Sequence, residues 1–565
     1  MWFSGLYRLI KECLRGGASR LAALLLPQIL PVFSVVAPCQ PGATLRNPLL
    51  VQSIQATCRF VAAAMFAVPL AFPVIASAQS SLADVIAAGD RRAALAMIAD
   101  GADVNQTQPD GSTPLHWAVY RVDQELVAAL LKKHARANVV NHYGASPLME
   151  AVRLANQDMV GMLLEADADP NVTNEDGQTA LMLAARTGRV GVAKALLEHG
   201  ADVNRREKYR DQSALMWAAA ESHATMVELL VSKGADLTIR ARANDWETQI
   251  SSEPRVQYRP TGGLTSLLYA ARAGCLGCVT AIVNAGADVN RPNPDGMTPM
   301  MMALDNGYPS VAQYLLDRGA NPHTWDWWGR TPLYVAVTMR GGVDSRSGPR
   351  PPESLAFIKA LLDAGVNPNP QLAFKEPSRG GRDNRFRDDL LTTGATPLLR
   401  AAQTFDNDVV RALLAHGALV DLPNASGVTP FMAAAGIGTR IAAGVLGPGT
   451  SASAAALSLE TMEILRAAGA DVNARITDVT SLTARIARTN TLTNRQGQTA
   501  LFYVAEIGRT PVVKYLLDHG ARVDMVDDMG RTPVDVAKGI ERGGPEAGSE
   551  DIKSLLTTVA AAGHP

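Results

Sequence analysis

The sequence predicts an all-α solenoid in which short helix-turn-helix units stack in a row. The clearest unit runs from Asp176 to Asn204, where apolar residues fall at helical spacing in two runs separated by Thr187-Gly188-Arg189. Its copies share an opening glycine, or Asp211 in the same place, and most successive openings lie 33 residues apart. Two helices of about ten residues are only marginally stable alone. The copies are therefore expected to stack on their neighbours.

Residues 1–78 precede the repeats and have the organisation of a leader. Arg59 stands before the apolar run 60–75, which ends in Ala76-Ser77-Ala78. A charged residue, an apolar run and a small-residue site in this order are typical of a secretory signal peptide. We expect the signal to span about 51–78, with cleavage between Ala78 and Gln79. The alternative is an uncleaved membrane anchor through 60–75, although that run is short for a membrane span.

The charge of the chain argues against nucleic acid as a partner. The whole sequence has a formal net charge of −1, and residues 1–78 contain six Lys and Arg against Glu12. The leader therefore carries +5, and the remainder carries −6. Binding to nucleic acid depends on clustered Lys and Arg on one face. A mildly acidic mature chain does not favour it.

The repeats begin with an imperfect unit and are interrupted by insertions where the openings lie 52, 65 or 70 residues apart. The expected organisation is a capping repeat at 79–109, repeats at 110–237, 263–338, 394–437 and 497–557, an insertion at 238–262, interrupted repeats at 339–393 and 438–496, and a tail at 558–565. The eleven openings are Gly111, Gly144, Gly177, Asp211, Gly263, Gly296, Gly329, Gly394, Gly427, Gly497 and Gly530. With the first unit they predict about twelve repeats.

The repeated motifs resemble those of the ankyrin repeat family. Thr113-Pro114-Leu115-His116 matches the family's opening, and the closing Gly-Ala-Asp-Val-Asn appears at Gly200 to Asn204 and returns in other units. The resemblance covers nearly all of residues 81–557. It implies paired helices joined by β-hairpin-like loops, and a protein-binding function without catalysis.

Two cysteines of the predicted mature chain form a Cys-Leu-Gly-Cys motif, Cys275 to Cys278. In an exported protein this spacing is compatible with a disulfide, a redox pair or half of a metal site. No second such motif completes a zinc site. We expect either two small buried residues or a short disulfide.

The sequence shows no motif of a catalytic or cofactor site. His-Glu-x-x-His, Gly-x-Ser-x-Gly, the P-loop and the dinucleotide glycine pattern are all absent. The Asp and Asn residues of the closing motif recur once per repeat, unlike a catalytic pair. We predict a chain that is not an enzyme and that needs neither a cofactor nor a metal.

The resemblance also indicates where a partner would bind. In this family, variable residues around the opening glycine and after the first helix line the concave face. Tyr, Trp and Arg, which dominate binding hot spots, occur here at such positions. The candidate partner-binding residues are Tyr120, Arg121, Tyr143, Arg153, Arg186, Tyr209, Arg210, Arg272, Trp327, Trp328 and Arg330.

Two of these groups have a structural alternative. Arg153, Arg186 and Arg272 share one column, interrupted by Ala220, and form either a ladder for an acidic partner or simply a residue common at that position. The pair Trp327 and Trp328 either contacts a partner or packs against the neighbouring insertion. Trp117 and Trp217 occupy the motif's apolar position and are expected in the core.

The sequence therefore predicts an exported, monomeric scaffold, periplasmic or secreted, that binds a protein partner on the concave face of the solenoid. Two other functions remain open. One is a secreted effector that acts on another organism's proteins. The other is a redox or metal role for Cys275 and Cys278.

Overall fold

The structure is a computed structural model, and it describes residues 80–244, 261–340, 352–373, 390, 393–437, 452–477, 495–537 and 549–562. The chain divides into two units, Met1–Gln79 and Ser80–Pro565. The predicted leader and its cleavage site after Ala78 belong to the first unit and lie outside the described residues. The second unit holds all the described elements.

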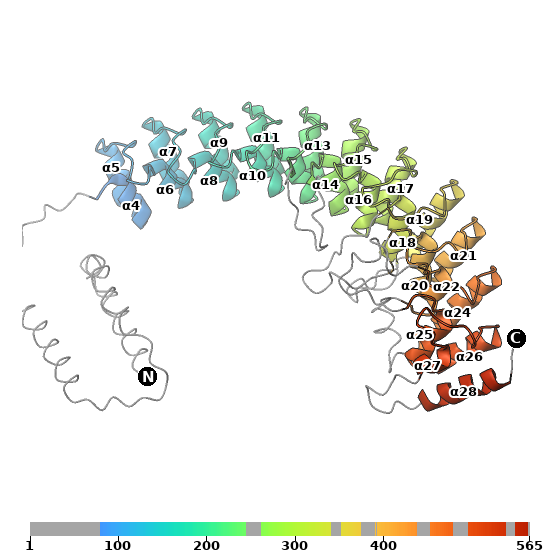
Figure 1. Cartoon of the computed structure of the whole chain (residues 1–565). Helices are drawn as coiled ribbons and strands as arrows, with labels where there is room; N and C mark the ends of the chain where they lie inside the picture. Colours follow the sequence, from blue (N-terminus) through green and yellow to red (C-terminus); the bar gives the residue numbers. More distant parts are fainter. Residues whose placement is uncertain are drawn as a thin grey trace, which may run out of the picture. The chain divides into compact units, whose positions relative to one another are not determined.

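The second unit consists of helices that follow one another in pairs (Figure 1). In each pair the first helix lies on one side of the row and the second helix on the other. The pairs are α4 (Leu82–Ala88) with α5 (Arg91–Ala99), α6 (Pro114–Tyr120) with α7 (Gln124–Lys132), α8 (Pro147–Arg153) with α9 (Gln157–Glu165), α10 (Ala180–Arg186) with α11 (Val190–Glu198), α12 (Ala214–Ala220) with α13 (Ala224–Ser232), α14 (Ser266–Ala273) with α15 (Leu276–Asn284), α16 (Pro299–Asp305) with α17 (Pro309–Asp317), α18 (Pro332–Arg340) with α19 (Pro352–Asp363), α20 (Pro397–Gln403) with α21 (Asn407–Ala415), α22 (Pro430–Ala434) with α24 (Ala452–Ala467), α25 (Ala500–Glu506) with α26 (Thr510–Asp518), and α27 (Pro533–Ala537) with α28 (Ser549–Ala561).

The first helices begin where the repeated Thr or Ser stands. Thr179 has extended backbone and its hydroxyl accepts a hydrogen bond from the backbone N–H of Met182, which satisfies one of the free donors at the start of α10. Where proline follows, as Pro147 does in α8, it occupies the first turn, where no backbone N–H is needed. The repeated Thr or Ser and the proline after it thus fix where these helices begin.

The core runs along the row between the two layers of helices. Most first helices pack on the first helices before and after them, as α12 does on α10 and α14. Ala184, Ala218 and Ala270 are fully buried at these contacts. Because alanine is small, neighbouring helices approach closely there, and the larger side chains of the second helices fill the space between pairs.

The closing Asn of a repeat joins it to the next one. The amide of Asn171 donates to the carbonyl oxygen of Gly200 at 2.9 Å, and its oxygen accepts from the backbone N–H of Asp202 at 2.7 Å. The same two bonds to the backbone of the following repeat are made by Asn138, Asn204 and Asn290. The recurrence of this Asn thus has a structural cause.

The all-α prediction is confirmed, with one small exception among the described residues. Strands β1 (Ala243–Asn244) and β2 (Thr261–Gly262) pair antiparallel, with Ala243 opposite Gly262, at the two ends of the predicted insertion 238–262. Residues 245–260 of that insertion lie outside the described residues. No described helix is long and apolar enough to cross a membrane.

Candidate functional site

The hairpin before α12 is held by a different side chain from that of a neighbouring repeat, Glu207 in place of an asparagine. In the hairpin before Gly144, the side-chain oxygen of Asn141 accepts backbone N–H bonds from Tyr143 and Ala145. Glu207 takes that place before Asp211, one residue further from the opening position. The longer side chain of Glu207 spans this longer hairpin, which accounts for the spacing of 34 between Gly177 and Asp211.

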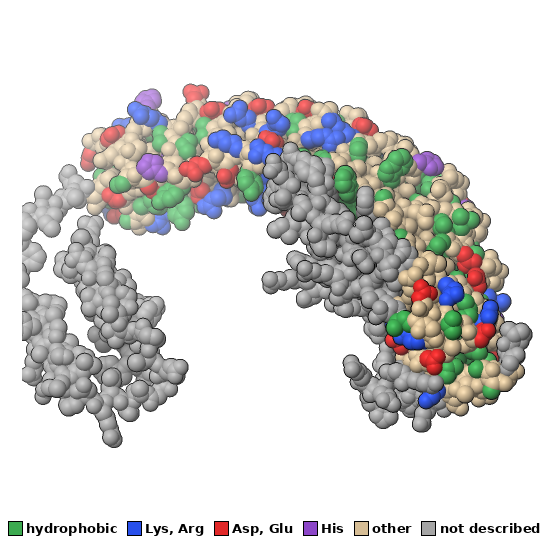
Figure 2. Space-filling model, viewed as in Figure 1, with side chains coloured by type: hydrophobic (Ala, Val, Ile, Leu, Met, Phe, Trp, Pro, Cys, Tyr) green, Lys and Arg blue, Asp and Glu red, His purple; other side chains and the backbone are tan. Residues whose placement is uncertain are grey.

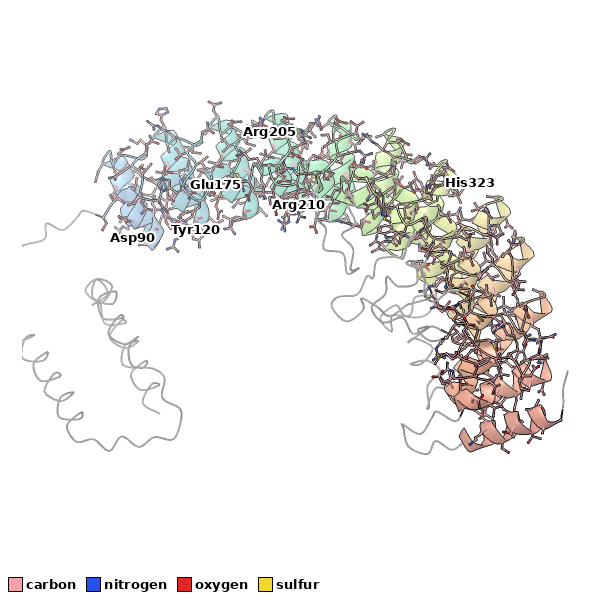
Figure 3. All side chains as sticks on the ribbon, viewed as in Figure 1. Asp90, Tyr120, Glu175, Arg205, Arg210 and His323 are labelled. Carbon is pink, nitrogen blue, oxygen red and sulfur yellow. A yellow bond between two sulfur atoms is a disulfide. The ribbon has the colours of Figure 1, made fainter. Side chains whose placement is uncertain are left out.

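The carboxylate of Glu207 is buried and holds the hairpin tip. It accepts backbone N–H bonds from Tyr209 at 2.6 Å, Arg210 at 2.7 Å and Gln212 at 3.1 Å. The tip therefore has a fixed backbone, while the side chains of Tyr209 and Arg210 project outward. Tyr209 is 71% exposed, and Figure 3 places Arg210 on the first-helix side of the row.

Behind this hairpin, two aromatic rings are joined by one amide. Gln212 donates through Nε2 to the hydroxyl oxygen of Tyr269 at 2.6 Å and accepts through Oε1 from the indole N–H of Trp217 at 3.1 Å. Trp217 belongs to α12 and Tyr269 to α14. Gln212 thus satisfies the indole N–H of Trp217 and donates to the hydroxyl oxygen of Tyr269, so the floor between the two helices is formed by the two rings and the amide that joins them.

Arginine guanidinium groups lie over these rings. Arg186 lies 5.5 Å from the centre of the Trp217 ring, and Arg272 lies 4.9 Å from that of Tyr269. Arg210 lies 5.8 Å from the ring of Tyr209 in the same hairpin. Stacking of this kind holds a guanidinium plane in place while its N–H edges stay available.

The rings, the arginines and the hairpin line a solvent-open pocket of about 580 Å³, which we call the hollow. Ala220 lines it at the place where the neighbouring first helices carry Arg186 and Arg272. The small side chain of Ala220 leaves the space that a third arginine of this column would fill. The lining residues are Asp176, Gln178, Arg186, Glu207, Tyr209, Arg210, Gln212, Trp217, Ala220, Glu221, Tyr269 and Arg272.

The structure thus brings four of the sequence candidates together around the hollow, namely Arg186, Tyr209, Arg210 and Arg272. Sequence reasoning missed Gln212 and Tyr269, and it expected Trp217 in the core. Trp217 is only half-buried, because one face packs on the core while the ring edge reaches Gln212. The interruption of the arginine column at Ala220 was the available signal for the hollow.

Four further candidates lie in the repeats before the hollow. Tyr143 is 77% exposed and Tyr120 is 54% exposed, and Figure 3 shows Tyr120 on the first-helix side. The guanidinium of Arg121 donates to the carbonyl oxygen of Ala87, and Arg153 forms a two-point ion pair with Glu150 in the same helix. These two arginines are exposed, but part of their bonding capacity is used within the chain.

The prediction that Trp328 and Arg330 contact a partner is wrong, because both are buried, at 4% and 5% exposure. Asp326 anchors this hairpin and pairs with Arg330 at 2.6 Å, while Asp305 pairs with it at 3.1 Å. The guanidinium is thereby drawn over the Trp328 ring, 4.9 Å from its centre. The carbonyl oxygen of Trp328 also accepts from the N–H of Ala373, in the neighbouring insertion. The packing alternative holds for Trp328, whereas Trp327 remains partly exposed.

Cys275 and Cys278 form a disulfide at the turn before α15. Cys275 is the residue before the helix, and Cys278 is fully buried within it. The disulfide alternative of the prediction therefore describes the structure. Within the described ranges, no group of three or more His, Cys, Asp or Glu side chains is placed to hold a metal ion.

The second-helix side of the row, away from the hollow, carries charges of both signs. Figure 2 shows Lys and Arg side chains gathered over the part of the row near α11 and α13, with acidic side chains among them. The fold and this site define a helical-repeat protein with a preformed hollow on its first-helix side.

The comparisons with known proteins identify the family. A family model of ankyrin repeats in three copies matches residues 82–174, 163–241, 250–326, 267–372 and 468–541, and the model of a single ankyrin repeat matches residues 393–425. These matches cover more than half of the chain, which therefore belongs to the ankyrin repeat family. They do not fix the number of repeats, which stays a prediction.

Individual relatives match over shorter stretches. Protein phosphatase 1 regulatory subunit 27 of Mus musculus, like that of Homo sapiens, is 41% identical over 59 residues, which are 10% of this chain and 38% of the relative. A putative palmitoyltransferase of Danio rerio, ZDHHC13, is 26% identical over 295 residues, which are 51% of this chain and 35% of the relative. The solved ankyrin repeat domain of Bcl-3 is 26% identical, with a TM-score of 0.34, and the match covers 40% of this chain and 94% of that domain.

Proposed function

We propose that the chain is a non-enzymatic scaffold that binds a protein partner along its first-helix side, from the repeat of Tyr120 to that of Arg272. The observation that carries the proposal is a set of exposed aromatic and arginine side chains along this stretch: Arg186, Tyr209 and Arg272 line the hollow, and Tyr120 and Tyr143 lie in the repeats before it. Such residues contribute most of the binding energy in protein interfaces.

The rigidity of the site supports this proposal. The tip of the hairpin is held by three hydrogen bonds to Glu207, and its neighbours are joined to it by backbone bonds, since Lys208 donates to Asp176 and Arg242 donates to Arg210. A surface that is ordered before binding loses little conformational entropy when a partner arrives. The binding surface thus needs no rearrangement of the backbone.

The relatives support a binding role only in outline. Two of them are named regulatory subunits of a phosphatase, a role that fits binding to another protein. The palmitoyltransferase relative is matched over 35% of its length, and the sequence of this chain shows none of the catalytic motifs sought above. That the chain is not an enzyme, and that it is monomeric, stay predictions.

The experiment is a comparison of partner recovery from the protein's own cells. The double variant Tyr143→Ala/Tyr209→Ala is expected to retain less of the co-purified partner than the unchanged chain, with unaltered helicity. Leu419→Ala is the control, because Leu419 is also exposed but lies at a closing motif beyond the proposed surface. Equal recovery with all three proteins would contradict the proposed surface.

We also propose that the chain is exported, on the pattern of Arg59, the apolar run 60–75 and Ala76-Ser77-Ala78. N-terminal sequencing of the protein recovered from the exported fraction is expected to begin at Gln79. A protein found whole with membranes would instead support the anchor alternative.

A further inference from the structure

The arginines of the hollow lack the acidic partners that other arginines of this chain have. Among the described residues, the guanidinium groups of Arg186, Arg210 and Arg272 are in no ion pair, and each is instead placed over an aromatic ring. By contrast, Arg153 is paired with Glu150 and Arg330 with Asp326. The hollow therefore presents three oriented cationic groups whose N–H donors have no carboxylate acceptor in the part of the chain that the structure describes.

We infer that the hollow binds a segment of the partner in which an Asp or Glu stands beside an aromatic or large aliphatic residue. The inference rests on the proposed protein-binding function and names the chemistry of the bound segment. The carboxylate would bind between Arg186 and Arg272, and the neighbouring apolar side chain would lie against the half-buried ring of Trp217, with the buried Tyr269 behind it.

Charge complementarity and geometry select a carboxylate. The planar guanidinium group matches a carboxylate through two parallel N–H bonds, and such charge-assisted bonds are stronger than neutral ones. Arg186 is the last residue of α10, and Arg272 lies in the last turn of α14. These helices stand on either side of α12, which carries Ala220, so an anion above Ala220 is approached from both sides. The aromatic stacking keeps both groups from turning away.

The floor selects an apolar neighbour for this carboxylate. The indole N–H of Trp217 is already bonded to Gln212, and Tyr269 is only 7% exposed, so a ligand side chain meets mainly the ring surface of Trp217 and need not satisfy its N–H. Burying an apolar side chain there is favourable in proportion to the area removed from water. A polar side chain of similar size would lose its water without gaining partners.

The rim disfavours a nucleotide or nucleic acid, which would also combine rings with negative charge. Asp176 and Glu221 line the same hollow and are in no ion pair with its three arginines. These carboxylates repel the doubly charged terminal phosphate of a nucleotide more strongly than a singly charged carboxylate, and a nucleic acid would bring one further negative charge with every phosphodiester. The predicted net charge of −6 for the mature chain acts in the same direction.

The test is a selection of peptides from a random displayed library on the full mature chain. The enriched peptides are expected to carry Asp or Glu next to Phe, Tyr, Trp, Leu or Met, and a synthetic peptide of that sequence is expected to bind at least tenfold more tightly than its Asp→Asn or Glu→Gln version. The affinity is also expected to fall as salt is raised, because the contact is electrostatic.

Two variants and a control locate the contact. Ala220→Arg fills the hollow with the residue that the neighbouring repeats carry in this column, so the fold tolerates it, and binding of the selected peptide should fall at least tenfold. Arg272→Gln should lower the affinity and abolish the preference for Asp over Asn. Arg318→Gln is the matched control, since Arg318 also lies over a tyrosine, 4.7 Å from the centre of Tyr314, but at the end of a second helix.

Several results would overturn the inference and leave the proposed function standing. One is enrichment of peptides without acidic residues, and another is binding that Ala220→Arg leaves unchanged. A third is tighter binding of a nucleotide or single-stranded nucleic acid, competed by the same variants. Failure to select any peptide also overturns the inference, whereas recovery of a partner that is sensitive to Tyr143→Ala/Tyr209→Ala would still support the scaffold.

Discussion

Replacing Asn171 with alanine should weaken the connection between two neighbouring repeats. The side chain donates to the carbonyl oxygen of Gly200 and accepts from the backbone N–H of Asp202. A hydrogen bond contributes about 0.5–1.5 kcal/mol net to stability. Losing both bonds should therefore lower the free energy of unfolding by about 1–3 kcal/mol, nearer the lower value because the bonds are at the surface.

Urea-induced unfolding followed by circular dichroism measures this loss, and hydrogen exchange locates it. Because the repeats are coupled mainly to their neighbours, the transition of Asn171→Ala is expected to broaden as well as shift. The amide proton of Asp202 should exchange faster, since its acceptor is gone, while amides in α6 and α7 should be unaffected.

His323→Ala provides the matched control. His323 occupies the same place in its repeat, yet its hydrogen bond is donated by its own backbone N–H to the side-chain oxygen of Asn321, and its side chain bonds to no other repeat among the described residues. This variant should shift the urea midpoint by much less than Asn171→Ala does. Equal shifts, or an unchanged exchange rate at Asp202, would refute the assignment of stability to the bridging asparagine.

Three further predictions follow from single sites. Trp328→Ala should lower the free energy of unfolding by about 3–5 kcal/mol because it removes a buried ring, whereas Trp327→Ala should cost far less, which thermal melting of both variants will show. Burial lowers the pKa of His116 below its ordinary value of 6.5, so its contribution to stability is present above pH 6.5 and is lost as the pH falls through the lowered pKa; His116→Gln should flatten the stability–pH curve there. Reducing the disulfide of Cys275 and Cys278 should lower the free energy of unfolding by about 2 kcal/mol on the chain-entropy model, because the loop is short. A larger loss on adding reductant than in the variant Cys275→Ser/Cys278→Ser would contradict this.

Local rules were sufficient to predict the helices and their order. The hydroxyl of Thr179 and the left-handed backbone of Gly200 begin and end a unit by short-range chemistry, and the 33-residue period carries that unit along the chain. The disulfide was one of the predicted alternatives for the same reason, because Cys275 and Cys278 are close in sequence.

The hollow could not be predicted in the same way, because it depends on contacts between repeats and on a missing side chain. Gln212 bonds to Tyr269 across 57 residues, past an insertion whose length hides their register. Ala220 helps to form the hollow because it stands where the neighbouring repeats have an arginine. The prediction for Trp328 was wrong because sequence position alone does not show that Asp326 draws Arg330 over the ring.

The most direct test of the central claim is site-specific photo-crosslinking in the protein's own cells, with a photoreactive amino acid placed at Tyr209 or, for comparison, at Leu419. If the partner binds at the hollow, the same polypeptide is crosslinked from position 209 in the otherwise unchanged chain and is lost when Ala220→Arg is added, with no such product from position 419. Crosslinking of that polypeptide from position 419 but not from position 209 would contradict binding on the first-helix side.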